Sequence, residues 1–196
     1  MGYTRGMLST LLALALSAVP AQADAVFTKK VTEAAQAQTN ERVVYDGRYL
    51  KIAYPGGDVP SGTGVCTDVV IRAYRKAGLD LQVAVHEDMK RNFSVYPKKW
   101  GRRAPDSNID HRRVPNLMTF FERRGASLSM TDRAADYKPG DVVAWDLGGG
   151  VTHIGVVVAD PLGAAKPLIV HNIGAGPKRE DVLFDWKVIG HYRYAP

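Results

Sequence analysis

The apolar residues of this chain change their spacing near Gly125, and that change limits the fold to one class. Before it, turn residues and apolar residues three or four positions apart predict helices over 24–38, 66–77, 81–92 and 114–124. After it, short β-branched runs bounded by Gly, Pro and Asp predict strands over 141–146, 153–159, 167–171 and 188–194. Helices followed by strands are typical of an α+β domain, with the strands expected to form a meandering antiparallel sheet.

Residues 1–23 carry the pattern of an export signal. Arg5 precedes an apolar run from Met7 to Val19, and Ala21-Gln22-Ala23 supplies a small-x-small cleavage site. The run is shorter than the roughly 20 residues that span a bilayer, so we expect cleavage rather than an anchor. The sequence therefore predicts a single mature domain over 24–196, periplasmic or secreted, with no membrane span.

Charge and motif spacing disfavour several partners. The formal net charge of +6 suits anionic surfaces such as cell-wall polymers. Export separates the protein from nucleic acid, so the basic cluster KRNFSVYPKKWGRR is predicted to be a solvated face. His86-Glu87-Asp88 and Asp110-His111 contain metal-ligand residue types. Since neither an HExxH spacing nor a cysteine pair accompanies them, we expect no metal and no cofactor.

Cys66 is the only cysteine in the sequence, and it stands in the string GTGVCTDVVIRAYRKAG. A glycine-rich turn leads there into a helix that ends at Gly78, which predicts that the sulfur lies in the first helical turn. The helix dipole and the free N–H groups of that turn favour a thiolate and predict a cysteine pKa below the usual value of about 8.5. The alternative is a buried cysteine that packs as a small apolar residue. An unpaired cysteine in an oxidising compartment favours the chemical role.

Two histidines are placed to meet this thiol. His153 opens a strand after Gly148-Gly149-Gly150, and His171 ends the next strand. The start of one antiparallel strand lies beside the end of its neighbour, so the two imidazoles are expected at one edge of the sheet. A thiol at a helix N-terminus, a histidine that takes its proton and a polar group that orients the histidine are the parts of an activated cysteine nucleophile.

At these residues the chain resembles the NlpC-like branch of the papain-fold cysteine peptidases and amidases, which act on bacterial cell walls. The resemblance covers Tyr54 to about His171 and rests on four strings in the family's order: Cys66-Thr67-Asp68, Pro139-Gly140-Asp141, His153-Ile154-Gly155 and Ile169-Val170-His171. It implies a papain-like α+β domain whose nucleophile opens a helix packed on an antiparallel sheet. The chain departs from the usual Asp-Cys-Ser-Gly pattern, because its acidic residue follows the cysteine.

A narrower resemblance extends over nearly the whole mature chain. The strings YPGGDVP, GVCTDVVIRAYR, HEDM and NIDHRRVPN are similar to the exported bacterial family of the YijF-like domain of unknown function. That family implies no activity, so the expected chemistry rests on the wider NlpC-like superfamily.

The wider resemblance implies a role for each matching residue. Cys66 is the nucleophile, His153 is the general base and then the general acid, and His171 orients His153. Asn172 takes the place of His171 if the strand register shifts by one residue, since such a slip exchanges the faces.

Other residues are expected to line the cleft. Tyr54 resembles the tyrosine that lines the superfamily's active site and donates to the oxyanion, and Tyr45 competes for that place. Asp68 either forms an ion pair with the arginine one helical turn later or is a charged wall that binds the substrate. His111 and Arg112 precede the third predicted helix, as a carboxylate clamp or as a solvated loop.

These features together predict an exported cysteine hydrolase that cleaves amide bonds in peptidoglycan, as an amidase or as a stem-peptide endopeptidase. It needs no cofactor, because the acyl group passes through a thioester on the cysteine. Two alternatives stay open: another acyl hydrolase on the same scaffold, and a non-catalytic module that binds the cell wall.

Overall fold

The computed structural model describes residues 18–163 and 166–196, and its α-helices precede the strands of the larger sheet along the chain, as predicted. The α-helices are α1 (Ala18–Ala37), α2 (Cys66–Ala77), α3 (Leu81–Asn92) and α4 (Val114–Arg123). Most of the predicted export signal, residues 1–17, lies outside the described part of the chain, and its remainder forms the start of α1. Over 18–163 and 166–196, no helix has both the length and the apolar character needed to cross a membrane.

Five strands form one sheet in the order β6-β5-β4-β3-β7, and every neighbouring pair is antiparallel. The strands are β3 (Val142–Asp146), β4 (Thr152–Val158), β5 (Leu168–His171), β6 (Lys178–Glu180) and β7 (Lys187–Tyr192). β6 was not predicted because its three residues are all charged. The expected meander was also wrong in one respect, since β7 returns to the opposite edge and pairs with β3.

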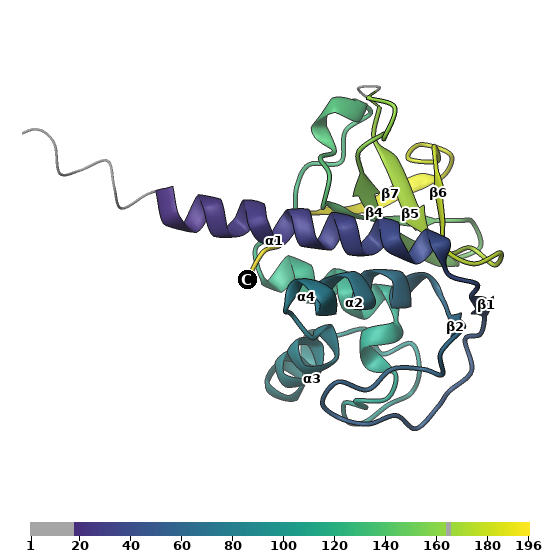
Figure 1. Cartoon of the computed structure of the whole chain (residues 1–196). Coiled ribbons are helices and arrows are strands. Elements are labelled where there is room, and N and C mark those ends of the chain that lie inside the picture. The colour runs from purple at the N-terminus through teal and green to yellow at the C-terminus, as the bar shows by residue number, and fades with distance from the viewer. Residues whose placement is uncertain (1–17, 164–165) are drawn as a thin grey trace, which may run out of the picture.

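Both faces of the sheet are buried. In Figure 1, α1 crosses the molecule between the strands and the other three helices, and it contacts both α2 and β4. Ile154, Val156 and Val158 of β4 pack into the core beneath these helices. The intervening Val157 faces a second core with Trp145, under the segment that follows β6. Burial of both faces explains why the β4 sequence is a continuous apolar run rather than an alternating one.

A buried ion pair joins the start of α2 to the loops around it. The guanidinium of Arg112 donates to the Asp68 carboxylate through two bonds of 2.9 Å, and the two side chains are 2% and 3% exposed. Arg112 also donates to the carbonyl groups of Arg48 and Asp46. Asp68 in turn accepts the N–H of Val65 at 2.6 Å. One carboxylate and one guanidinium therefore hold three separate segments together.

This pairing corrects both roles that the sequence suggested for Asp68. The arginine one turn later, Arg72, donates instead to Asp58, at 2.9 and 3.1 Å. Asp68 is buried against Arg112, so its carboxylate stabilises the helix start and does not form an exposed wall.

Removing the carboxylate from this pair is expected to destabilise the domain. Asp68→Ala leaves a buried guanidinium without its counter-ion, which should lower the free energy of unfolding by roughly 3–5 kcal/mol. Urea denaturation followed by circular dichroism measures this. The control is Arg48→Met, which removes the exposed Arg48–Asp46 pair and should leave the midpoint unchanged. Equal midpoints for the two variants would contradict the stabilising role of the buried pair.

Candidate active site

Cys66 is the first residue of α2, as the sequence predicted, and its side chain is buried and unpaired. The residue before it, Val65, is extended, so the chain turns sharply into the helix at this point. The sulfur lies near the backbone N–H groups of Thr67 and of Cys66 itself, at the helix end, and near that of Ile154 in β4. The nucleophile candidate is therefore placed between the helix N-terminus and the start of a strand.

Burial dominates the acidity of this thiol. Desolvation raises the pKa of Cys66 to about 11, and the nearby Asp68 charge acts in the same direction. The backbone N–H groups around the sulfur lower the pKa, but by less. The predicted fall in pKa was therefore wrong, because the apolar surroundings disfavour the thiolate more than the helix end favours it.

The two histidines meet as predicted. His153 Nε2 and His171 Nδ1 lie 2.8 Å apart, and both rings are buried. On the other side, His171 Nε2 lies 2.9 Å from Glu180 Oε2. The indole of Trp186 covers the pair, with ring centroids 6.0 Å from His153 and 6.1 Å from His171. A covered hydrogen bond of this kind is shielded from competing water.

The backbone of β4 places His153 next in sequence to the residue that approaches the sulfur. The N–H group near the sulfur belongs to Ile154, the next residue along the strand. Within the described residues no hydrogen bond joins the sulfur to either imidazole. Since His171 occupies Nε2 of His153, Nδ1 is the nitrogen of that ring left for another partner.

Burial favours the neutral form of both imidazoles. It lowers the pKa of His153 to about 3, with a smaller contribution from His171. Burial also lowers the pKa of His171, and the hydrogen bond to Glu180 opposes that effect. Burial therefore favours a protonated Cys66 thiol and a neutral His153.

Gly155 lets His171 approach β4. A Cβ atom at this position would stand 2.7 Å from Ile169 Cγ2 and 3.1 Å from His171 Cβ. Any larger residue would push β5 and its histidine away. This contact gives a physical reason for the glycine in the His-x-Gly string.

Asn172 points away from the histidine pair. Its amide nitrogen donates to the Gly64 carbonyl at 3.3 Å, and its amide oxygen accepts the N–H of Gly174 at 3.1 Å. The register thus places His171, and not Asn172, against His153.

A cleft of about 250 Å³ opens at Cys66. Its lining comes from the loop before α2, the loop before α4 and the start of β4: Tyr45, Gly47, Val65, Cys66, Trp100, Ile109, Arg112, Arg113, Val114, Pro115 and Thr152. Trp100, which the sequence assigned only to a basic cluster, forms part of the wall and carries the Arg113 guanidinium 4.0 Å above its ring.

Tyr45, and not Tyr54, lies beside the nucleophile. A short parallel pairing of β1 (Val44–Tyr45) with β2 (Thr63–Gly64) brings Tyr45 next to the residues that precede Cys66. Burial raises the Tyr45 pKa, with a further contribution from Cys66. The Tyr54 hydroxyl instead donates to Glu87 at 3.1 Å, and its ring packs on His86. The competing tyrosine therefore holds the place expected of Tyr54.

Of the residues expected to bind substrate, only Arg112 lines the cleft, and its charge is balanced by Asp68. His111 is buried outside it, where burial lowers its pKa to about 4. Over 18–163 and 166–196, no three His, Cys, Asp or Glu side chains are grouped so as to hold a metal ion.

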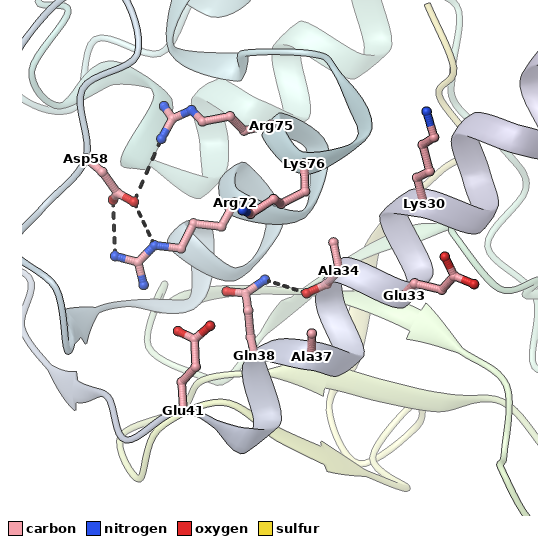
Figure 2. Close-up of a pocket in the computed structure, with 10 residues that line it drawn as sticks. All are labelled: Lys30, Glu33, Ala34, Ala37, Gln38, Glu41, Asp58, Arg72, Arg75 and Lys76. Carbon is pink, nitrogen blue, oxygen red and sulfur yellow. Dashed lines mark hydrogen bonds and ion pairs between the residues drawn. The ribbon is translucent and has the colours of Figure 1, made fainter.

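A second and larger pocket lies elsewhere, between α1 and α2, with a volume of about 490 Å³. Figure 2 shows its charged lining, in which Arg72 and Arg75 both approach Asp58. Neither cysteine nor histidine is among the described residues that line it. Size alone would favour this pocket, but the groups capable of acyl transfer are at Cys66.

Comparisons with known proteins agree with this architecture. A family model described as a domain of unknown function, DUF1287, matches residues 32–194. The uncharacterized protein YijF of Escherichia coli strain K12 is 51% identical over 164 residues, which cover 84% of this chain and 80% of YijF.

Two solved structures are similar at low sequence identity. An N-acetylmuramoyl-L-alanine amidase from Bacteroides uniformis matches with a TM-score of 0.54 and 14% identity, over 85% of this chain and 98% of that chain. NlpC1 from Trichomonas vaginalis matches with a TM-score of 0.44 and 15% identity, over 85% of this chain but only 44% of its own. The likeness to the amidase concerns the fold, and the predicted α+β, papain-like architecture is confirmed.

The raised pKa of Cys66 predicts slow alkylation at neutral pH. A thiol with a pKa of about 11 is about 0.1% thiolate at pH 8. A free cysteine with a pKa of about 8.5 is roughly one quarter thiolate there, so iodoacetamide should label Cys66 on the order of a hundredfold more slowly. The rate should still rise between pH 9 and pH 11. Protein unfolded in urea is the control. A labelling rate that reaches its plateau below pH 8 in the native protein would refute the raised pKa.

Proposed function

The chain belongs to the DUF1287 family, and for it we propose the function of a cysteine hydrolase that cleaves amide bonds in peptidoglycan. One observation carries the proposal: His153 Nε2 lies 2.8 Å from His171 Nδ1, at the strand start that adjoins the Cys66 sulfur. To Cys66, His153 and His171 we assign the roles of nucleophile, base and group that orients the base. The fold shared with a muramoyl-alanine amidase supports an amide substrate, and the predicted export signal supports action outside the cytoplasmic membrane.

The first half of the reaction forms a thioester. As the Cys66 sulfur attacks the amide carbonyl carbon, its proton passes to Nδ1 of His153, so no thiolate accumulates beforehand. The negative charge develops on the former carbonyl oxygen, where the backbone N–H of Cys66 and the Tyr45 hydroxyl are the proposed donors. The C–N bond then breaks, His153 returns its proton to the leaving amine, and the acyl group stays on sulfur.

The second half releases the acid. His153, neutral again, takes a proton from a water molecule that attacks the thioester carbonyl. The carbon–sulfur bond breaks and Cys66 recovers its proton from His153. His171 holds the ring of His153 in one orientation through both halves.

The walls of the cleft suit a fragment that combines sugar and peptide. Trp100 presents a partly exposed aromatic face, and sugar rings bury their apolar sides on such surfaces. The Arg113 guanidinium beside it pairs with Asp110 at 3.1 Å, and its remaining N–H groups are the proposed donors to a substrate carboxylate.

Removal of the nucleophile or of its base should abolish turnover. In Cys66→Ala and His153→Ala we expect release of peptides or amino sugars from purified peptidoglycan to fall by at least about a thousandfold, because the covalent route is lost. Mass spectrometry of the soluble products measures the loss and identifies the bond that is cut. Leu162→Ala, at a position that is 92% exposed, is the control and should retain full turnover.

Two other outcomes separate the alternatives. Equal product release by wild type and Cys66→Ala would exclude the cysteine mechanism. Sedimentation of wild type with insoluble wall, without turnover and weakened by salt, would identify the non-catalytic binding module. Turnover of a simple thioester but not of wall fragments would indicate another acyl hydrolase.

A further inference from the structure

The hydrogen bond between His153 and His171 continues through His171 to the edge strand β6. Glu180 Oε2 lies 2.9 Å from His171 Nε2, on the side of that ring opposite His153. Glu180 is paired across the sheet with Ile169, two residues before His171 on the same face of β5. Its side chain is 40% exposed, so the carboxylate contacts both the buried histidine and water.

We propose that Glu180 is a positioning residue that fixes the tautomers of both histidines so that Nδ1 of His153 is free to take the proton of Cys66. The proposal rests on the function proposed above and adds to it a fourth member on β6.

The hydrogen bonds of Glu180, His171 and His153 determine which ring nitrogens carry protons. An ionised carboxylate can only accept a hydrogen bond, so the proton of neutral His171 must be on Nε2, facing Glu180. Nδ1 of His171 is then an acceptor, and the 2.8 Å contact requires that His153 donate through Nε2. A neutral His153 that carries its proton on Nε2 has its lone pair on Nδ1. Glu180 thus determines which nitrogen of a ring two contacts away can act as the base.

The same chain stabilises the charge that develops during the reaction. When His153 becomes an imidazolium, His171 accepts its Nε2 proton more strongly and donates more strongly to Glu180. The other charged side chain that influences His171 is Lys178, directly opposite it on β6, and its effect has the opposite sign. The Glu180 carboxylate therefore offsets an unfavourable neighbour as well as the burial of the ring.

Three variants test the proposal. Glu180→Ala removes the acceptor, and Glu180→Gln keeps an acceptor oxygen without the charge. Asp181→Asn is the matched control, because Asp181 is the adjacent carboxylate and pairs with Lys166 instead of a histidine. Thermal melts establish that each variant is folded.

The first measurement needs no substrate. Nitrogen-15 NMR of protein labelled at histidine, assigned with His171→Ala and His153→Ala, reports which ring nitrogen carries the proton. We expect the Nε2–H form of both rings in wild type and in Asp181→Asn, and a mixture with the Nδ1–H form in Glu180→Ala. Unchanged tautomers in folded Glu180→Ala would overturn the proposal.

The second measurement is kcat/KM on wall fragments. The kcat/KM of Glu180→Ala should be on the order of tenfold to a hundredfold below that of wild type, which is the usual cost of removing an outer hydrogen-bond partner of a functional histidine. The kcat/KM of Glu180→Gln should fall by less, and that of Asp181→Asn should stay at the wild-type value. A tautomer change with full turnover would overturn the positioning role. A tautomer change in a protein whose wild type cleaves no wall fragment would support the hydrogen-bond assignment and refute the proposed function instead.

Discussion

The bond between Asp68 and Arg112 is the interaction on which the site depends. The carboxylate caps the start of α2 through the Val65 N–H, and the guanidinium ties that start to the carbonyl groups of the loop that carries Tyr45. Two charges buried this deeply are stable only when each satisfies the other and further polar groups as well. The acidic residue that follows Cys66 by two positions thus anchors the helix that begins at that cysteine.

The second constraint is the alternation of side chains along β4. Ile154 enters the core beneath the helices and its N–H reaches the sulfur, while His153 extends to the other face, beneath Trp186. The Cys66 thiol and the His153 imidazole therefore belong to opposite layers of the sheet, beside two consecutive residues of one strand. Gly155 completes the arrangement, because only a residue without a side chain lets His171 lie against the next position of that strand.

Local patterns were sufficient to predict the helix that begins at Cys66, the strands at His153 and His171, and the meeting of the two rings. Helix signals and strand pairing depend on neighbours in the sequence or on one turn between strands. The thiol pKa depends on burial, to which distant segments contribute, and the helix dipole alone predicted the wrong direction. The position of Tyr45 depends on a two-residue strand pairing that is too short to be recognised in the sequence. The position of Glu180 depends on a strand that contains no apolar residue.

The buried, protonated thiol also bears on the lifetime of the protein. Thiolates attack peroxides and disulfides, and the predicted export signal implies a compartment that contains both kinds of reagent. The sequence offers no second cysteine that could resolve a sulfenic acid on Cys66, so overoxidation of that sulfur would be irreversible. Because burial raises the pKa of the thiol to about 11, little thiolate is present at neutral pH and oxidants react slowly with the sulfur. The apolar surroundings of Cys66 thus slow the oxidation of the single thiol in the sequence.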